Sequence, residues 1–92
     1  MIVEVCIGPG HPDITDFEVE GYNQNNDYVK TPMIDIWGNP DIWRCRVVGG
    51  YFWKGTISVH FYNFNGVVYK YLGTRLCYVG VSGPDPAQCQ FP

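Results

Sequence analysis

The chain has 92 residues, a formal net charge of −3 and no apolar run near the roughly 20 residues of a membrane-spanning helix. This length suits one domain, residues 1–92, and excludes a large core, because only about 60–65% of the unfolded surface becomes buried. Three Trp, seven Tyr and five Phe partly compensate. Eight of the nine acidic residues precede residue 42 and five of the six basic residues follow it, an asymmetry that bears on partners rather than on fold.

Four cysteines are spread along the chain, at Cys6, Cys45, Cys77 and Cys89. Zinc sites need close pairs such as C-x2-C, so this spacing favours disulfides and an oxidising compartment. Four cysteines allow three connectivities, of which we favour Cys6–Cys89 with Cys45–Cys77. The first would tie the two ends of the chain and remove about 4–5 kcal/mol of unfolded-state entropy. We expect a secreted protein in which Met1 replaces a removed leader.

The N-terminal half predicts a strand, a helix and a loop. Residues 2–6 alternate and are β-branched, which predicts the strand. Asp13 can cap a short helix that ends near Gly21, with acidic residues in its early turns. The same segment also fits a strand, because its residue types suit either structure. Residues 23–32 are polar and turn-forming, which predicts a surface loop.

The rest of the chain predicts strands separated by Gly, Pro and Asn turns. They are expected at residues 33–37, 42–48, 56–62, 66–72 and 75–81. The Asn65-Gly66 pair predicts a hairpin turn, because it accepts positive φ. The fold class is therefore expected to be α+β, with one short N-terminal helix packed on a mostly antiparallel twisted β-sheet and two disulfides.

Four short features resemble a known family. They are a first strand that ends in Cys6, a Gly21-Tyr22 pair at the end of the helix, the hairpin SVHFYNFNGVVYKYLG, and Cys89 within SGPDPAQCQF. In this order they resemble the guanyl-specific microbial ribonuclease fold, and in particular the ribonuclease-like secreted effectors of cereal powdery mildew fungi. The chain departs from that pattern at Glu4, where these effectors usually carry an aromatic residue, and in its second cysteine pair.

The resemblance implies a catalytic set of Glu, Arg and His on three neighbouring strands. The corresponding places fall near Trp43–Cys45, Ser58 and Tyr71–Leu72, and none of them holds the implied residue. We therefore expect no enzyme but a pseudo-ribonuclease, with no cofactor and no metal site.

Two histidines and one carboxylate pair are the alternative candidates for catalytic groups. We expect His60 to be a half-exposed strand histidine packed between aromatic rings, because no carboxylate is placed to orient it. A displaced general base is the alternative for His60. His11 is expected to be solvated in its loop, and an Asp35–Asp41 pair is no stronger than chance.

The expected function is that of a catalytically inactive secreted fungal effector of the avirulence type. The resemblance implies that it is translocated into the cytoplasm of the plant cell, binds host proteins and is a target for an intracellular immune receptor. We expect a monomer with no membrane contact. Exposed aromatic and basic side chains are the candidate contacts, although Phe52 and Trp53 also fit a core. The candidates are Arg44, Arg46, Tyr51, Trp53, Lys54, His60, Tyr69, Lys70, Tyr71 and Arg75.

Three other functions remain open. Non-catalytic RNA binding would use the same basic residues, with Tyr69 and Tyr71 stacking on bases. A secreted inhibitor of host hydrolases would present a rigid loop, for which Ser82–Pro86 is the candidate. An active ribonuclease is the least favoured of these functions, because the expected catalytic groups are missing.

Overall fold

The computed structural model describes residues 3–7, 10–11, 13–36, 44–48, 50–79 and 87–90, of which 44–46 and 87–90 are described as backbone alone. Within these ranges the chain forms two sheets. The first has the order β5-β1-β8, and the second has the order β3-β2-β6-β7 with β4 also paired to β2. The strands are β1 Val3–Ile7, β2 Asp16–Asn23, β3 Tyr28–Lys30, β4 Ile34–Asp35, β5 Arg44–Val48, β6 Trp53–Phe64, β7 Tyr69–Val79 and β8 Ala87–Gln90.

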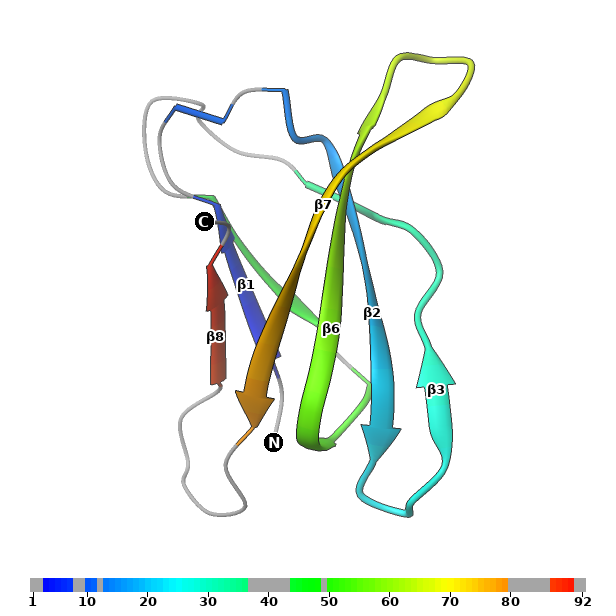
Figure 1. Ribbon diagram of the computed structural model, residues 1–92, viewed down its shortest axis with the longest axis vertical. Coiled ribbons are helices and arrows are strands. Elements are labelled where there is room, and N and C mark those ends of the chain that lie inside the picture. Colours follow the sequence, from blue (N-terminus) through cyan, green and yellow to red (C-terminus); the bar gives the residue numbers. More distant parts are fainter. Residues whose placement is uncertain are drawn as a thin grey trace.

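The two sheets share one hydrophobic core. Val3, Val5 and Ile7 alternate along β1 and are buried, and Ile57, Val59 and Phe61 do the same along β6. Alternation with a period of two sends one set of side chains to the same face of each sheet. Figure 1 shows β8, β1 and β5 beside and behind the layer formed by β7, β6, β2 and β3. No helix in the described ranges is long and apolar enough to cross a membrane.

The expected α+β class is wrong, because the described residues form strands and no helix. The segment expected to be the helix carries β2, which begins at Asp16. Phe17 and Val19 are buried on the core side, whereas Glu18 and Glu20 point to the other face and are only partly buried. This period of two satisfies a sheet, whereas a helix would need apolar residues three and four apart.

Two further expectations need correction. The predicted loop over residues 23–32 contains β3, which pairs with β2 between Glu20 and Tyr22. Residues 69–79, which span most of the two strands expected at 66–72 and 75–81, form one strand, β7, and its register with β6 shifts between the partners of Phe61 and Tyr62. The predicted hairpin is confirmed. Its turn lies at Gly66, where φ is 97°, and the backbone N–H groups of the next two residues donate to Asn65 Oδ1.

The expected framework of two disulfides is not shown by the described residues. Cys6 Sγ lies 3.4 Å from Glu4 Oε1 and donates to it as a thiol, so the described residues do not show the predicted Cys6–Cys89 cystine. The backbone register places Cys89 opposite Val5 instead. Cys77 is half of a cystine whose partner lies outside the described side chains. The predicted Cys45–Cys77 pair therefore stays a prediction.

Candidate functional site

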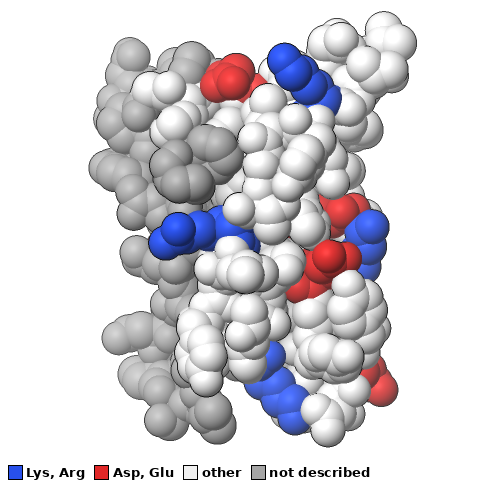
Figure 2. All heavy atoms as spheres, in the orientation of Figure 1, with Lys and Arg blue, Asp and Glu red and all other residues white. Residues whose placement is uncertain are grey.

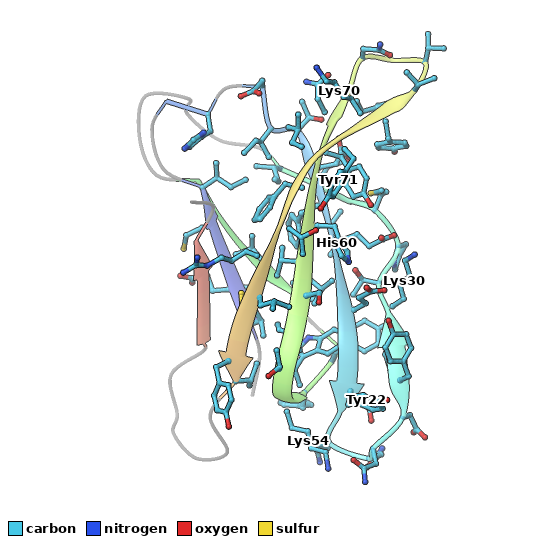
Figure 3. All side chains as sticks on the ribbon, in the orientation of Figure 1. Tyr22, Lys30, Lys54, His60, Lys70 and Tyr71 are labelled. Atoms are coloured by element: carbon cyan, nitrogen blue, oxygen red, sulfur yellow. The ribbon has the colours of Figure 1, made fainter. Side chains whose placement is uncertain are left out.

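Six tyrosines lie on the outer face of the larger sheet, which we call the tyrosine face. The strands that carry these tyrosines are neighbours. Each tyrosine faces away from the core, because it alternates with a buried residue of its own strand or pairs with an outward-facing residue of the next strand. Figure 3 shows His60 and Tyr71 in front of β6 and β7, and Tyr22 and Lys30 near β2 and β3. The tyrosine face consists of Tyr22, Tyr28, Tyr62, Tyr69, Tyr71 and Tyr78.

His60 lies in the middle of this face with both ring nitrogens engaged. Its Nε2 is 2.9 Å from Glu20 Oε1, and its Nδ1 is 2.7 Å from Thr74 Oγ1. Glu20 also accepts a hydrogen bond from the Tyr28 hydroxyl. The hydrogen bonds from His60 and then Tyr28 lower the pKa of Glu20, and the same Glu20 contact raises the pKa of Tyr28. The expectation that no carboxylate orients His60 is therefore wrong.

A bulge in β7 completes this network. Tyr71 pairs with Tyr62 and Thr74 pairs with His60, so one extra residue of β7 lies between the two pairs. In a regular strand, residues three apart would point to opposite faces. Because of the bulge, Tyr71 and Thr74 share the outer face, and their hydroxyl groups form a hydrogen bond. The network thus connects Tyr28 on β3, Glu20 on β2, His60 on β6, and Thr74 and Tyr71 on β7.

Two acidic side chains on this face are paired within it. Lys30 Nζ lies 3.5 Å from Glu18 Oε1 across β2 and β3, beside the pair formed by Glu20 and His60. Burial raises the pKa of Tyr62, and the charge of Glu18 raises it further. Figure 2 shows acidic and basic groups close together at one side of the face, further basic groups at its two ends and its other side, and an uncharged surface between them. The face therefore offers aromatic rings and hydroxyls rather than a strong net charge.

The aromatic rings at the β6–β7 end hold one another in place. The Tyr62 ring forms T-shaped pairs with the rings of Tyr69 and Tyr71, and the ring centroids are 6.2 and 5.8 Å apart. Phe64 stacks on Tyr69 at 4.4 Å. Such pairs contribute about 0.5–1.5 kcal/mol each beyond their burial. The rings form a preordered surface, since few rotamers remain open to them.

The structure places four of the predicted contact residues on the outer face of the larger sheet. His60, Tyr69 and Tyr71 lie among the tyrosines, and Lys54, at the end of β6, is the register partner of Tyr22. Trp53 is 2% exposed and belongs to the core, so it is no surface contact, whereas Phe52 is 49% exposed. Tyr51 lies beside Trp53. Lys70 and Arg75 are on the side of β7 that faces away from the tyrosine face. Arg44 and Arg46 are on β5, where only the backbone is described.

Several residues of this face were missed from the sequence. Glu20 was assigned to a helix, and Thr74, Leu76 and Tyr78 received no role. Leu76 and Tyr78 are 66% and 81% exposed. The alternation of Thr74, Leu76 and Tyr78 is the signal that could have found them, because it sets three residues on one face of a strand. Of the weighed carboxylate pair, Asp35 faces Asp16 across β2 and β4, and Asp41 lies outside the described residues, as does the loop Ser82–Pro86.

The network fixes the His60 ring between a carboxylate and a hydroxyl group. In the neutral imidazole, Nε2–H donates to Glu20 and Nδ1 accepts from the Thr74 hydroxyl, so both ring nitrogens are hydrogen-bonded within the face. Among the described residues, no group of three or more His, Cys, Asp or Glu side chains could hold a metal ion.

Comparison with known protein families, curated proteins and solved structures finds no match to this chain. The resemblance to ribonuclease-like effectors thus depends on short motifs alone, and the helix among them is a strand.

Proposed function

We propose that this chain is a non-catalytic recognition domain of a secreted effector, and that its tyrosine face binds an uncharged surface of a host protein. The observation that carries the proposal is the gathering of six tyrosines on one face, on which Glu18 and Glu20 are already paired with Lys30 and His60. Tyr supplies a large, rigid and amphipathic contact area at low entropic cost and is enriched at hot spots.

The size of the face fits a protein partner. The molecule measures 35 × 26 × 20 Å, and the tyrosine face is seen along its shortest axis. A face of these dimensions can supply the roughly 800 Å² that each partner buries in a standard interface. The exposed rings of Tyr71 and Tyr78, with Leu76 between them, would be the centre of such a contact, because exposed apolar patches mark interaction sites.

RNA binding is less favoured by the charges. Lys70 and Lys54 lie at opposite ends of the molecule (Figure 3), and Arg75 is the register partner of Val59 in the middle of β6. Binding to a phosphate backbone needs several cations along one track. Glu18 and Glu20 would instead repel phosphates from the middle of the face.

Affinity capture from plant extract, followed by titration of the purified partner, tests the proposal. We expect the double variant L76S/Y78S to bind the partner at least about 30-fold more weakly, the effect of losing a hot spot of ~2 kcal/mol. The control Val67→Ser removes an equally exposed apolar side chain at the hairpin tip and should bind as the wild type does. Equal binding by the double variant would place the interface elsewhere.

An RNA cleavage assay tests the absence of catalysis. We expect no turnover by the wild-type chain. Measurable turnover that disappears in His60→Ala would show instead that the Glu20–His60 pair is catalytic.

A further inference from the structure

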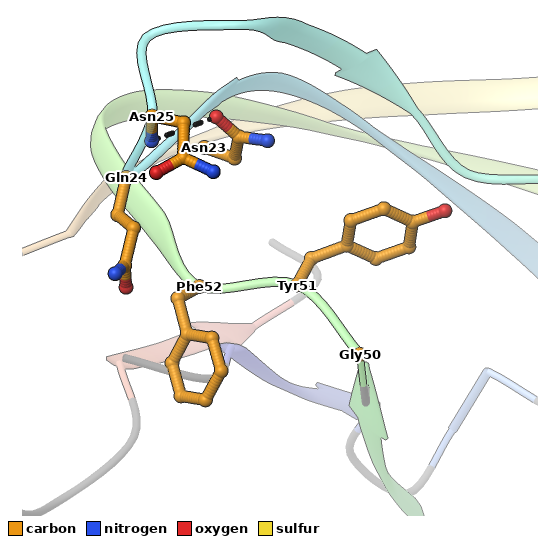
Figure 4. Close-up of a pocket in the computed structure, with 6 residues that line it drawn as sticks. All are labelled: Asn23, Gln24, Asn25, Gly50, Tyr51 and Phe52. Atoms are coloured by element: carbon orange, nitrogen blue, oxygen red, sulfur yellow. Dashed lines mark hydrogen bonds between the residues drawn. The ribbon is translucent and has the colours of Figure 1, made fainter.

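A small pocket lies at one end of the larger sheet, away from the His60 network. It has a volume of about 170 Å³. Two segments far apart in the sequence form it, the turn between β2 and β3 and the link between β5 and β6 (Figure 4). The described residues that line it are Asn23, Gln24, Asn25, Gly50, Tyr51 and Phe52.

Backbone hydrogen bonds fix the walls of this pocket. Gln24 N–H donates to the carbonyl oxygen of Phe52 at 2.7 Å, which ties the turn to the link. Within the turn, Asn23 Oδ1 accepts from the backbone N–H groups of Asn25 and Asp27, at 2.9 and 3.0 Å. The ring of Tyr51 packs against the buried Trp53, and the centroids of the two rings are 5.3 Å apart. A preformed site loses little conformational entropy on binding.

The lining combines carboxamides with an exposed aromatic ring. No hydrogen bond within the described part of the chain occupies the side-chain amides of Gln24 and Asn25. Each amide offers a donor and an acceptor. Phe52 is about half exposed, and Figure 4 shows Gln24 and Phe52 directed to the same side of the pocket. The lining residues carry no charge, so nothing there would select an ion.

We propose that this pocket binds one sugar ring of a neutral glycan. A pyranose has an apolar C–H face that can lie against the Phe52 ring, and hydroxyl groups that can pair with the amides of Gln24 and Asn25. The volume is about half of the ~300 Å³ at which pockets for drug-sized ligands begin, so the site suits a single ring. This proposal goes beyond the protein contact of the tyrosine face and does not depend on it.

Titration of the ¹⁵N-labelled chain with methyl glycosides of glucose, galactose, mannose and N-acetylglucosamine tests this site. Concentrations up to about 50 mM cover the millimolar affinity of so small a contact. We expect at least one sugar to shift the side-chain amide signals of Gln24 and Asn25 in a saturable way. Phe52→Ala should weaken that binding at least tenfold, and Gln24→Ala provides a second variant that keeps the backbone hydrogen bond.

The control variant Tyr78→Ser changes an exposed ring of the tyrosine face and should leave sugar binding unchanged. A dispersed spectrum verifies that each variant is folded. The proposal is overturned if no sugar gives a saturable shift, or if Phe52→Ala and Gln24→Ala both bind as the wild type does. Equal shifts with N-methylacetamide would assign the pocket to a peptide amide instead.

Discussion

Asp16 is a buried acid that faces a second acid. Its side chain is 3% exposed and accepts a hydrogen bond from Thr15 Oγ1, and Asp35 lies opposite it on β4. Burial raises the pKa of Asp16, and the hydrogen bond and charge of Asp35 raise it further, against the Thr15 contact. A shared proton relieves the repulsion between the two carboxylates, as it does in other close carboxyl pairs.

This pair predicts that Asp16 makes the fold less stable as the pH rises. A raised pKa in the folded state means that the native chain binds more protons than the unfolded chain. Its contribution is therefore complete below the ordinary value of 3.8 and is lost as the pH rises through the folded pKa. We expect Asp16→Asn to gain stability relative to the wild type between pH 3 and pH 7, measured by chemical denaturation.

Asp27→Asn is the matched control, because Asp27 is exposed in the β2–β3 turn. A constant difference between wild type and Asp16→Asn across this pH range would show that Asp16 and Asp35 do not share a proton.

The His60 environment shows which part of the site a sequence can predict. The alternation of β6 and β7 placed His60 and Tyr71 on exposed strand faces, so both were named as contacts. The Glu20 partner of His60 lies 40 residues earlier in the chain. No local sequence pattern indicates a contact over that separation, so the pairing of Glu20 with His60 could be recognised only once the fold was known.

At the scale of the element, β2 shows why a local signal failed. Asp13 and the acidic residues after it are typical of a helix start. Glu18 and Glu20 nevertheless gain cross-strand partners in the sheet, Lys30 and His60. Such pairs and core burial outweigh propensities of a few tenths of a kcal/mol per residue. By contrast, the hairpin between β6 and β7 was predicted because its turn and both strands are contiguous.

Gly21 allows β2 to approach β6 closely. A Cβ at this position would lie 2.8 Å from Ile57 Cγ2 and 3.3 Å from Ile57 Cα. Because Ile57 is buried, neither group can move aside freely. We expect Gly21→Ala to lower the free energy of unfolding by about 1–3 kcal/mol, measured by urea denaturation.

Thr56→Ala is the control for this variant, because Thr56 is exposed on β6, and its effect should stay within about 0.5 kcal/mol. An unchanged midpoint for Gly21→Ala would mean that the two strands have room for a methyl group.

At the scale of the molecule, both sheets depend on the same core. Buried side chains from β1 in one sheet and from β2, β6 and β7 in the other form a single cluster. Neither sheet could keep its apolar face covered alone. We therefore expect far-UV circular dichroism and tryptophan fluorescence to report one coincident unfolding transition. Two separated midpoints would show that the sheets unfold independently.

The two edges of the larger sheet differ in length and continuity. On the β2 side, β3 and β4 are short. Between them Thr31 bonds to Val19 twice, because its N–H donates to the Val19 carbonyl oxygen and its Oγ1 accepts from Val19 N–H, each at 2.8 Å. Pro32, next to it, has no N–H to offer a further strand. On the other side, β7 runs for 11 residues and pairs only with β6 among the described strands of this sheet. Of the two edges of this sheet, β7 therefore offers the longer continuous row of backbone groups to which a strand of a second molecule could pair.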